Sequence, residues 1–505
     1  MSRPPESLEA ENAMERDIAV IDVGSNSVRL VHFRMVGRAL WPVFNEKTSA
    51  ELGKGLGETG KLNPDGVQGT LRALRRFSIL LDAKGVTERI VFATAAVRDA
   101  ADGKAFIKRA KKEAGVKIAT LSGKEEARLA ALGVVAGIPY ATGAAADLGG
   151  SSLEIIPVAL ARPGDGITLR LGPLAAPDDL MKSRKAAKAW IDDRLKPATP
   201  VLKQCGDTLY AVGGAWRALA QLAIAEADYP LRVIHQFQLS RGAAKQIADF
   251  AARLTVASLA GTPGVSARRA AMLPYAGLLL KRLMKKGKFN RVVFSAYGLR
   301  EGAVYDRLPE TVQMLDPLLA GTEAVARPAA PSPSFGRAIA AWLEPVFAAR
   351  DTHFGNRSAL IRAAAARLCD VGARHHPDHR AALARELALF APFAGVAHAE
   401  RAYMGLVMHH RYDGKRTPAD SRVFHHLLDE ETRQHALAYG LGLRFAAALS
   451  GRSEALLSRF LLTVNEADLV LCAPESDTDL VVERARHRFE QMAEALELNP
   501  VLNSV

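Results

Sequence analysis

The chain has 505 residues, with 67 Lys and Arg against 54 Asp and Glu, and 49% of its residues are hydrophobic. This composition is that of a globular protein and excludes the disordered and fibrous classes. The length predicts about three domains, each large enough to bury its own core. The longest uncharged stretch, residues 129–146, is interrupted by glycine and proline, so we expect no membrane-spanning helix.

The spacing of the cysteines and the composition of the N-terminal residues indicate the cellular compartment of the protein. Cys205, Cys369 and Cys472 are far apart and form no C-x-x-C pair, so neither a disulfide framework nor a zinc site is predicted. Residues 1–17 lack the apolar core of a secretory signal. We therefore expect a cytoplasmic protein without a membrane partner.

Two similar strand–turn–strand patterns follow along the chain. Residues 18–21 form a β-branched run that ends at Asp22, and the turn Gly24–Ser27 leads into the apolar run 28–33. The same pattern returns at Asp147, with the turn Gly149, Gly150, Ser151 and Ser152 followed by a strand from residue 153. Both turns match D-x-G-x-x-S and lie 125 positions apart, which indicates an internal repeat at domain scale.

Between and after these turns, predicted strands alternate with predicted helices. Examples are a strand over 90–93, a helix over 104–114, and a strand over 209–212 that precedes the glycine turn Gly213-Gly214 and a helix over 217–224. This alternation is typical of α/β domains.

The last third of the chain has a different composition. Residues 311–336 are rich in Pro, Ala and Ser and are predicted to be a linker. Residues 337–450 have helical periodicity, and residues 451–505 contain a predicted strand over 468–472 and a final helix over 479–496. The predicted domains are therefore 1–130, 131–310, 337–450 and a small α+β region over 451–505.

The two repeated turns suggest a phosphate site. Glycine turns direct successive backbone N–H groups toward an anion, and two such turns would hold one phosphoryl group from both sides. Asp22 and Asp147 stand at the strand ends and are suited to Mg²⁺, to which Glu154 would add another carboxylate. Each single turn could instead be an ordinary hairpin, and Glu154 could be a solvent-facing strand residue.

The segment 121–129 supplies a candidate general base. Ser122 and Glu125 have the S-x-x-E spacing of a capping box, in which Glu125 returns to the backbone N–H of Ser122. Glu126 lies about 100° further around the helix and would be free to point into a cleft and activate water. It could instead be a solvated helix residue.

Basic residues suggest anion binding at two further places. Arg98 ends a predicted strand and would bind phosphate bidentately, unless it forms a surface pair with Asp99. Residues 250–300 hold ten Lys and Arg and no acid, which suggests a guide for a polyanion or else a solvated helix face balanced by acids elsewhere.

Taken together, these segments resemble the exopolyphosphatase and guanosine pentaphosphate phosphatase family, a branch of the actin, sugar-kinase and heat-shock ATPase superfamily. The matching segments occur in family order over about 300 residues: AVIDVGSNSVRL (19–30), ELGKGL (51–56), ATAAVRDA (93–100), LSGKEEARLA (121–130), ADLGGSSLEI (146–155), AVGGAWRALA (211–220) and YGLREGAVYDRL (297–308).

The resemblance implies roles for individual residues. It implies two phosphate loops (Gly24, Ser25, Asn26 and Ser27; Gly149, Gly150, Ser151 and Ser152), a phosphate-binding Arg98, a catalytic base Glu126, and the metal-associated acids Asp22, Asp147 and Glu154. The ion would be Mg²⁺, or else Mn²⁺. Ser151 departs from the family's usual glycine, and a positive φ there would be unfavourable.

The resemblance also implies a fold and partners. The fold class would be α/β, with two actin-like (ribonuclease H-like) domains followed by an all-helical domain similar to HD phosphohydrolases and a small α+β appendage. No His-Asp dipeptide occurs in the chain, and Cys369-Asp370 stands in its place. We therefore interpret the histidine-rich helical domain as a non-catalytic scaffold and polyanion guide. The family further implies a homodimer.

The predicted activity is hydrolysis of the terminal phosphate of inorganic polyphosphate, rather than nucleic-acid binding. The nearest competing activity is hydrolysis of guanosine pentaphosphate, which would make guanosine penta- or tetraphosphate alarmones the ligands of this chain. A nucleotide-binding regulator without turnover and a kinase of the same superfamily are two further possibilities.

Overall fold

The computed structural model describes residues 15–177, 179–330, 332, 334–350 and 354–504. Residues 1–14, on which the expectation of no secretory signal largely rests, lie outside the described part. The contacts divide the chain into two compact units, Met1–Met314 and Leu315–Val505. No helix of the described residues is long and apolar enough to cross a membrane.

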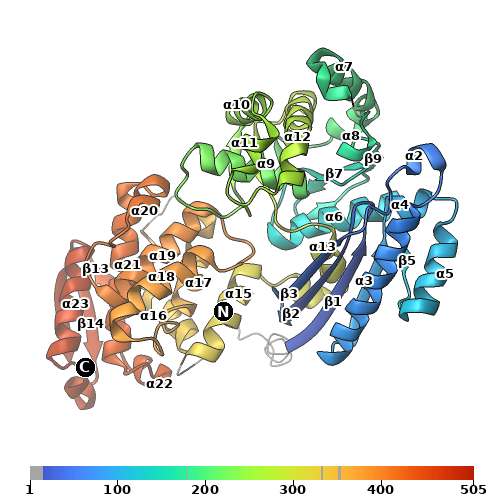
Figure 1. Ribbon diagram of the computed structural model, residues 1–505. Helices are drawn as coiled ribbons and strands as arrows, with labels where there is room; N and C mark the ends of the chain where they lie inside the picture. The colour runs from blue at the N-terminus through green and yellow to red at the C-terminus, as the bar shows by residue number, and fades with distance from the viewer. Residues whose placement is uncertain (1–14, 178, 331, 333, 351–353, 505) are drawn as a thin grey trace. The chain divides into compact units, whose positions relative to one another are not determined.

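The first unit begins with a five-stranded sheet of order β3-β2-β1-β4-β5 (Figure 1). Its strands are β1 (Glu15–Val23), β2 (Ser27–Val36), β3 (Ala39–Ser49), β4 (Glu88–Ala93) and β5 (Ala119–Thr120). Its helices are α2 (Leu56–Thr59), α3 (Pro64–Ala83), α4 (Ala95–Asp99), α5 (Gly103–Ala114) and α6 (Gly123–Gly137). Strand β1 is buried because it pairs antiparallel with β2 and parallel with β4.

A second sheet in the same unit has the order β11-β12-β10-β6-β7-β8, and β9 pairs with β7. Its strands are β6 (Gly143–Leu148), β7 (Leu153–Ala159), β8 (Arg162–Pro163), β9 (Ile167–Leu169), β10 (Thr208–Val212), β11 (Gln238–Ser240) and β12 (Arg291–Phe294). The helices are η1 (Pro173–Ala175), η2 (Leu180–Lys182), α7 (Arg184–Arg194), η3 (Lys196–Ala198), α8 (Thr199–Leu202), α9 (Gly214–Glu226), α10 (Arg241–Ala251), α11 (Val256–Ala260), α12 (Ala267–Lys286), α13 (Leu299–Tyr305) and α14 (Glu310–Gln313).

The predicted internal repeat is present in the two sheets. Strands β1 and β2 form an antiparallel hairpin beside the parallel strand β4, and β6 and β7 form one beside the parallel strand β10. The same backbone hydrogen bond closes both turns, from Gly24 N to Ser27 O at 3.1 Å and from Gly149 N to Ser152 O at 3.0 Å. The α/β prediction for this part of the chain is therefore confirmed.

Helices α6 and α13 approach each other closely at glycines. A Cβ added to Gly302 would lie 1.8 Å from the carbonyl oxygen of Leu129, and one added to Gly133 would lie 2.1 Å from that of Gly298. Neither backbone oxygen can move away without separating the helices. This contact matters because α6 carries Glu126 and α13 carries Arg300.

We expect Gly302→Ala to lower the free energy of unfolding of the chain by about 1–3 kcal/mol, because it overpacks this crossing. Denaturant unfolding would measure the change. Gly57→Ala on α2 is the matched control, because an added Cβ there meets nothing within 4 Å. Equal stability of the two variants would show that α6 and α13 tolerate a wider separation.

The second unit is helical up to its last segment. Its elements are α15 (Pro317–Ala329), α16 (Phe335–Phe347), η4 (Gly355–Arg357), α17 (Ser358–Arg367), η5 (Pro377–His379), α18 (Arg380–Phe390), α19 (His398–Asp413), α20 (Arg422–Leu427), α21 (Glu430–Leu449), α22 (Glu454–Leu457), β13 (Leu461–Asn465), β14 (Asp468–Ala473), η6 (Glu475–Leu480), α23 (Glu483–Ala495) and β15 (Asn499–Ser504). The three strands form a sheet of order β13-β14-β15. This sheet and α23 contain the strand and helix predicted for the end of the chain.

Residues 311–336, predicted from composition to be a linker, are helical over much of their length. Helix α15 occupies Pro317–Ala329. Asp316 caps it by accepting hydrogen bonds from the N–H groups of Leu318 and Leu319, and Pro317 stands at its first turn. Pro317 thus marks the start of a helix. Gly321 allows the helix backbone to approach the ring of Phe393 closely.

The paired histidines of the second unit have structural partners. His409 Nε2 lies 2.8 Å from the carbonyl oxygen of Arg416, and His410 Nδ1 lies 2.6 Å from that of Gly414. Burial lowers the pKa of His410 to about 4. His376 caps η5, because its Nδ1 accepts from the N–H of Asp378. These contacts give His376, His409 and His410 structural roles in the helical unit.

Candidate active site

A cavity of about 270 Å³ in the first unit brings most of the predicted site residues together. Its walls include both glycine turns, the four acids Asp22, Glu126, Asp147 and Glu154, and several basic side chains. Of the predicted site residues, Arg98 alone does not line the cavity, but it contacts one residue that does.

The two glycine turns face each other across this cavity. A Cβ added to Gly150 would lie 3.9 Å from the Cβ of Ser25 and 4.0 Å from that of Asn26. The carbonyl of Ser25 accepts from Gly53 N at 2.8 Å, and the carbonyl of Gly150 accepts from Leu174 N at 2.8 Å. These bonds fix the peptide planes of both turns, as an anion site formed by backbone N–H groups requires.

Ser151 fits its turn without backbone strain. It is not among the described non-glycine residues with a positive φ. Its carbonyl accepts from Gly172 N at 3.1 Å, so a glycine is not needed at this position.

Helix α6 begins as predicted, but Glu125 has a different partner. The Ser122 hydroxyl accepts from Glu125 N at 3.2 Å, which is the first half of the expected capping box. The second half is absent, since the Glu125 carboxylate binds Arg128 at 2.9–3.0 Å. Arg128 also binds Asp306 of the turn after α13. An arginine one helical turn away therefore attracts Glu125 more strongly than the cap does.

Glu126 points into the cavity, where it forms an ion pair. It is 9% exposed, and its Oε2 lies 3.0 Å from Nη1 of Arg98. Burial raises the pKa of Glu126 to about 7, against the opposing effect of Arg98 and with repulsion from Asp147 and Asp22. The expectation of a free carboxylate is thus corrected, because the predicted base and the predicted phosphate-binding arginine are paired with each other.

Arg98 is held by three acceptors. Besides Glu126, it donates to the carbonyl of Leu121 at 3.1 Å and to Asp99 at 3.1 Å. The surface pair with Asp99 is therefore present, and the pair with Glu126 holds Arg98 next to the cavity. Phosphate binding by Arg98 stays a prediction.

The remaining acids form a repulsive cluster. Burial raises the pKa of Asp147 to about 6, and repulsion from Asp22 adds to this shift. Burial raises the pKa of Glu154 well above its usual range, with further repulsion from Glu126 and Asp147. Burial likewise raises the pKa of Asp22, which is opposed by Arg300 at 2.8 Å.

The donor set fits a hard divalent cation. Glu154 is 2% exposed, and its Oε1 has no hydrogen-bond partner. Among the described residues no group of three or more His, Cys, Asp or Glu is assembled as a ready metal site. Mg²⁺ does not require one, because it binds through one or two carboxylates together with phosphates and water. Asp147 and Glu154 suit this role better than Asp22, which already has Arg300 as its partner.

Sequence reasoning missed three basic residues of the cavity: Arg29, Lys47 and Arg217. Burial, together with repulsion from Arg300 and Arg217, lowers the pKa of Arg29 to about 10. Arg29 follows the first turn by two residues on β2, and Arg217 lies in the first turn of α9. Their proximity to glycine turns was the available signal. An anion in the cavity would relieve the repulsion among these cations.

The basic segment 250–300 divides between its two predicted roles. Arg268, Arg269 and Arg300 line the cavity, and Arg268 binds Asn26 of the first turn. Lys281 and Arg282 pair instead with acids, at 2.8 Å from Asp249 and 2.5 Å from Asp192. The polyanion interpretation therefore suits the start of α12, and the charge-balanced interpretation suits its later turns.

Comparison with known proteins adds independent observations. The model of the Ppx/GppA phosphatase family matches residues 31–311, and a second model, described as "Exopolyphosphatase, C-terminal", matches residues 318–498. Exopolyphosphatase 1 of Mycobacterium tuberculosis is 28% identical over 303 residues, covering 58% of this chain and 88% of the relative. Exopolyphosphatase 1 of Mycobacterium leprae is 27% identical over 305 residues, covering 58% and 89%.

Solved structures resemble the same part of the chain. The Ppx/GppA family member of Aquifex aeolicus matches with a TM-score of 0.52 and 25% identity, over 58% of this chain and 97% of that one. An exopolyphosphatase from Cytophaga hutchinsonii matches with a TM-score of 0.52 and 24% identity, over 57% and 97%. These likenesses confirm the predicted fold class, an actin-like α/β part followed by a helical C-terminal region.

Proposed function

Because the chain belongs to the Ppx/GppA phosphatase family, we propose that it is a phosphoanhydride hydrolase that releases terminal orthophosphate from inorganic polyphosphate. The observation that carries this proposal is the cavity in which two equivalent glycine turns face each other beside the Glu126–Arg98 pair. The names of the relatives support the substrate class.

The last phosphoryl group of the polyphosphate would lie between the two turns and accept hydrogen bonds from their backbone N–H groups. Glu126 takes a proton from the attacking water, and Arg98 orients this carboxylate. Phosphoryl transfer has a loose transition state, so placement and charge stabilisation supply most of the catalysis. Arg29, Arg217 and Arg300 provide the positive charge around the cavity.

Asp147 and Glu154 would hold Mg²⁺, with Mn²⁺ as the other candidate. When bound, the ion neutralises charge on the phosphate oxygens and helps to orient them.

Phosphate release from long-chain polyphosphate, compared with release from guanosine pentaphosphate, tests the substrate. We expect a higher kcat/KM with polyphosphate. A higher kcat/KM with the nucleotide would assign the chain to guanosine pentaphosphate hydrolysis. Absence of phosphate release from both in Mg²⁺ would indicate a regulator, and transfer of phosphate to ADP would indicate a kinase.

Polyphosphate binding should weaken steeply with salt, because each neutralised phosphate releases counterions. The basic residues of the cavity predict a linear rise of log KM with log salt concentration. Arg268→Ala should reduce the slope by about one unit. Arg282→Ala, on the same helix but outside the cavity, is the matched control and should leave the slope unchanged. A flat salt response of the unmodified chain would contradict the prediction.

A further inference from the structure

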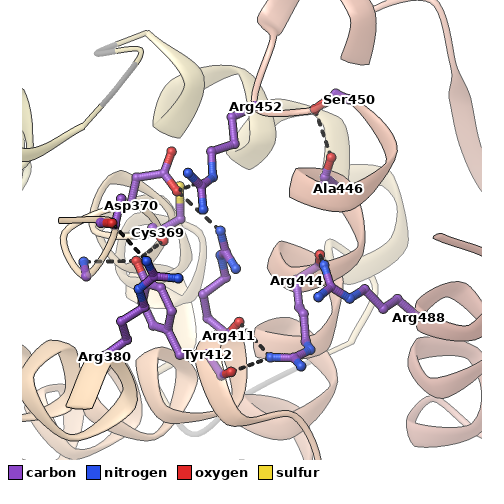
Figure 2. Close-up of polar contacts among 12 residues, drawn as sticks. Cys369, Asp370, Arg380, Arg411, Tyr412, Arg444, Ala446, Ser450, Arg452 and Arg488 are labelled. Atoms are coloured by element: carbon purple, nitrogen blue, oxygen red, sulfur yellow. Dashed lines mark hydrogen bonds and ion pairs between the residues drawn. The ribbon is translucent and has the colours of Figure 1, made fainter. Parts of the chain in front are cut away.

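A second cavity, of about 710 Å³, lies wholly within the unit Leu315–Val505. We call it the arginine cavity, because seven arginines and two aspartates line it: Arg380, Arg411, Arg416, Arg444, Arg452, Arg484 and Arg488, with Asp378 and Asp413. They come from α18, α19, α21, α23 and the segments that flank these helices. Figure 2 shows Arg411 and Arg452 pointing toward Asp370, and Arg444 between Tyr412 and Arg488.

The positive charge of the arginine cavity is only partly compensated, although Arg416 lies 3.7 Å from Asp413. Arg411 and Arg452 share one carboxylate, that of the buried Asp370, at 3.2 and 3.3 Å (Figure 2). Arg444 donates to the carbonyl of Tyr412, and Arg488 donates to the carbonyl of Arg444 at 3.3 Å. Neither of these two guanidiniums forms an ion pair within the described part of the chain.

Two further observations indicate that the arginines are arranged for a ligand. Arg411 is only 5% exposed, and its Nε has no hydrogen-bond partner. Burial, followed by repulsion from Arg444, Arg484 and other arginines, lowers the pKa of Arg488 to about 10. Burial and neighbouring arginines also lower the pKa of Arg444. These guanidiniums are buried and repel one another, and a bound anion would relieve that repulsion.

The arginine cavity also accounts for the residues found in place of the His-Asp dipeptide. Asp370 is bound by two guanidiniums, and Cys369 is buried with its carbonyl bound by the hydroxyl of Tyr412 at 2.8 Å. The carboxylate of Asp370 therefore binds two arginine side chains of this chain.

The lining of the arginine cavity is not uniformly basic. Ala381, Ala447, Ala448, Ala485 and the exposed Val482 form an apolar part. Among the described residues, the two aspartates have only long contacts with basic side chains, Asp413 with Arg416 at 3.7 Å and Asp378 with His376 at 3.6 Å, so their oxygens can accept hydrogen bonds from a ligand. A simple phosphate chain would meet repulsion at these carboxylates and gain nothing from the apolar part. The hydroxyl and amino groups of a nucleoside complement the carboxylates, and a base fits the apolar part. The volume lies within the range of about 300–1,000 Å³ found for small-molecule sites.

We propose that the arginine cavity binds a nucleoside polyphosphate, with the phosphates on the arginines and the nucleoside on the alanine, valine and aspartate side. Bidentate hydrogen bonds to phosphate are the interaction for which clustered arginines are best suited. This proposal does not depend on the activity assigned to the first unit.

Isothermal titration calorimetry of the full chain in EDTA, with GTP, inorganic tripolyphosphate and guanosine as probes, tests the proposal. GTP should bind more tightly than either of the other two. In Arg484→Ala/Arg488→Ala the Kd for GTP should rise by about tenfold or more, since two charge-assisted contacts are lost. Arg486→Ala is the matched control on the same helix, because Arg486 does not line the cavity, and should leave the Kd unchanged.

Arg268→Ala distinguishes GTP binding in the arginine cavity from GTP binding in the first unit. It alters the cavity of the first unit and should leave GTP binding in the arginine cavity intact. If the double variant does not fold, Arg484→Glu at an exposed position must weaken GTP binding in the same way. The proposal is overturned if no GTP binding survives Arg268→Ala, if Arg486→Ala weakens it equally, or if the double variant binds GTP normally. Tripolyphosphate binding as tightly as GTP would overturn the nucleoside assignment.

Discussion

Glu126→Gln is expected to lower kcat for phosphate release by about 10²–10⁴, the usual effect of removing an aligned general base. The amide keeps the size of the side chain and an oxygen for Arg98, but it cannot accept the proton of water at neutral pH. The KM for polyphosphate should change little, because the glycine turns and the basic side chains remain. Steady-state measurement of phosphate release would give both constants.

Glu125→Gln provides the matched control for this experiment. The two glutamates are adjacent on α6, but Glu125 binds Arg128 and does not line the cavity. Its replacement should leave kcat close to that of the unmodified chain. An unchanged kcat in Glu126→Gln would remove Glu126 from the role of base, and equal losses in both variants would point to a general disturbance of α6.

Glu154→Gln is expected to raise the Mg²⁺ concentration for half-maximal activity by at least about 10- to 100-fold. The reason is that Glu154 is buried, has an oxygen without a partner and is repelled by Glu126 and Asp147. The replacement should also raise the thermal stability of the chain in EDTA, because burial and the neighbouring acids disfavour the ionised form of Glu154 only in the folded chain. Mg²⁺ should then stabilise the variant less than it stabilises the unmodified chain.

Asp165→Asn is the control for this prediction, because Asp165 is exposed and pairs with Lys124 outside the cavity. Thermal unfolding with and without Mg²⁺, together with Mg²⁺ titration of activity, distinguishes the two variants. If Glu154→Gln had the same Mg²⁺ dependence as the unmodified chain, Glu154 would not be a ligand.

The fold of the first unit was predictable because its signals are local. The turns at Gly24 and Gly149 are preceded by apolar strands and closed by hydrogen bonds three residues apart, so the sequence contains both the turn and its flanks. The closeness of the two turns was inferred only from their similarity. Their separation of 125 residues gives no direct information on distance.

Contacts between distant segments were not predictable. The ion pairs of Asp22 with Arg300 and of Glu126 with Arg98 join residues 278 and 28 positions apart, and no periodicity relates their members. The helix within the predicted linker was missed for a different reason. The cap Asp316 followed by Pro317 is a local helix-start signal, but the segment was interpreted from its composition alone. The approach of Gly321 to Phe393, in contrast, depends on tertiary packing.

The most direct test of the proposed site is a crystal structure of the chain with inorganic phosphate bound. The phosphate is predicted to lie within hydrogen-bond distance of backbone N–H groups from both Gly24–Ser27 and Gly149–Ser152, on the side of the cavity that holds Glu126. A phosphate bound elsewhere in the first unit, or contacted by one of these turns alone, would contradict the account.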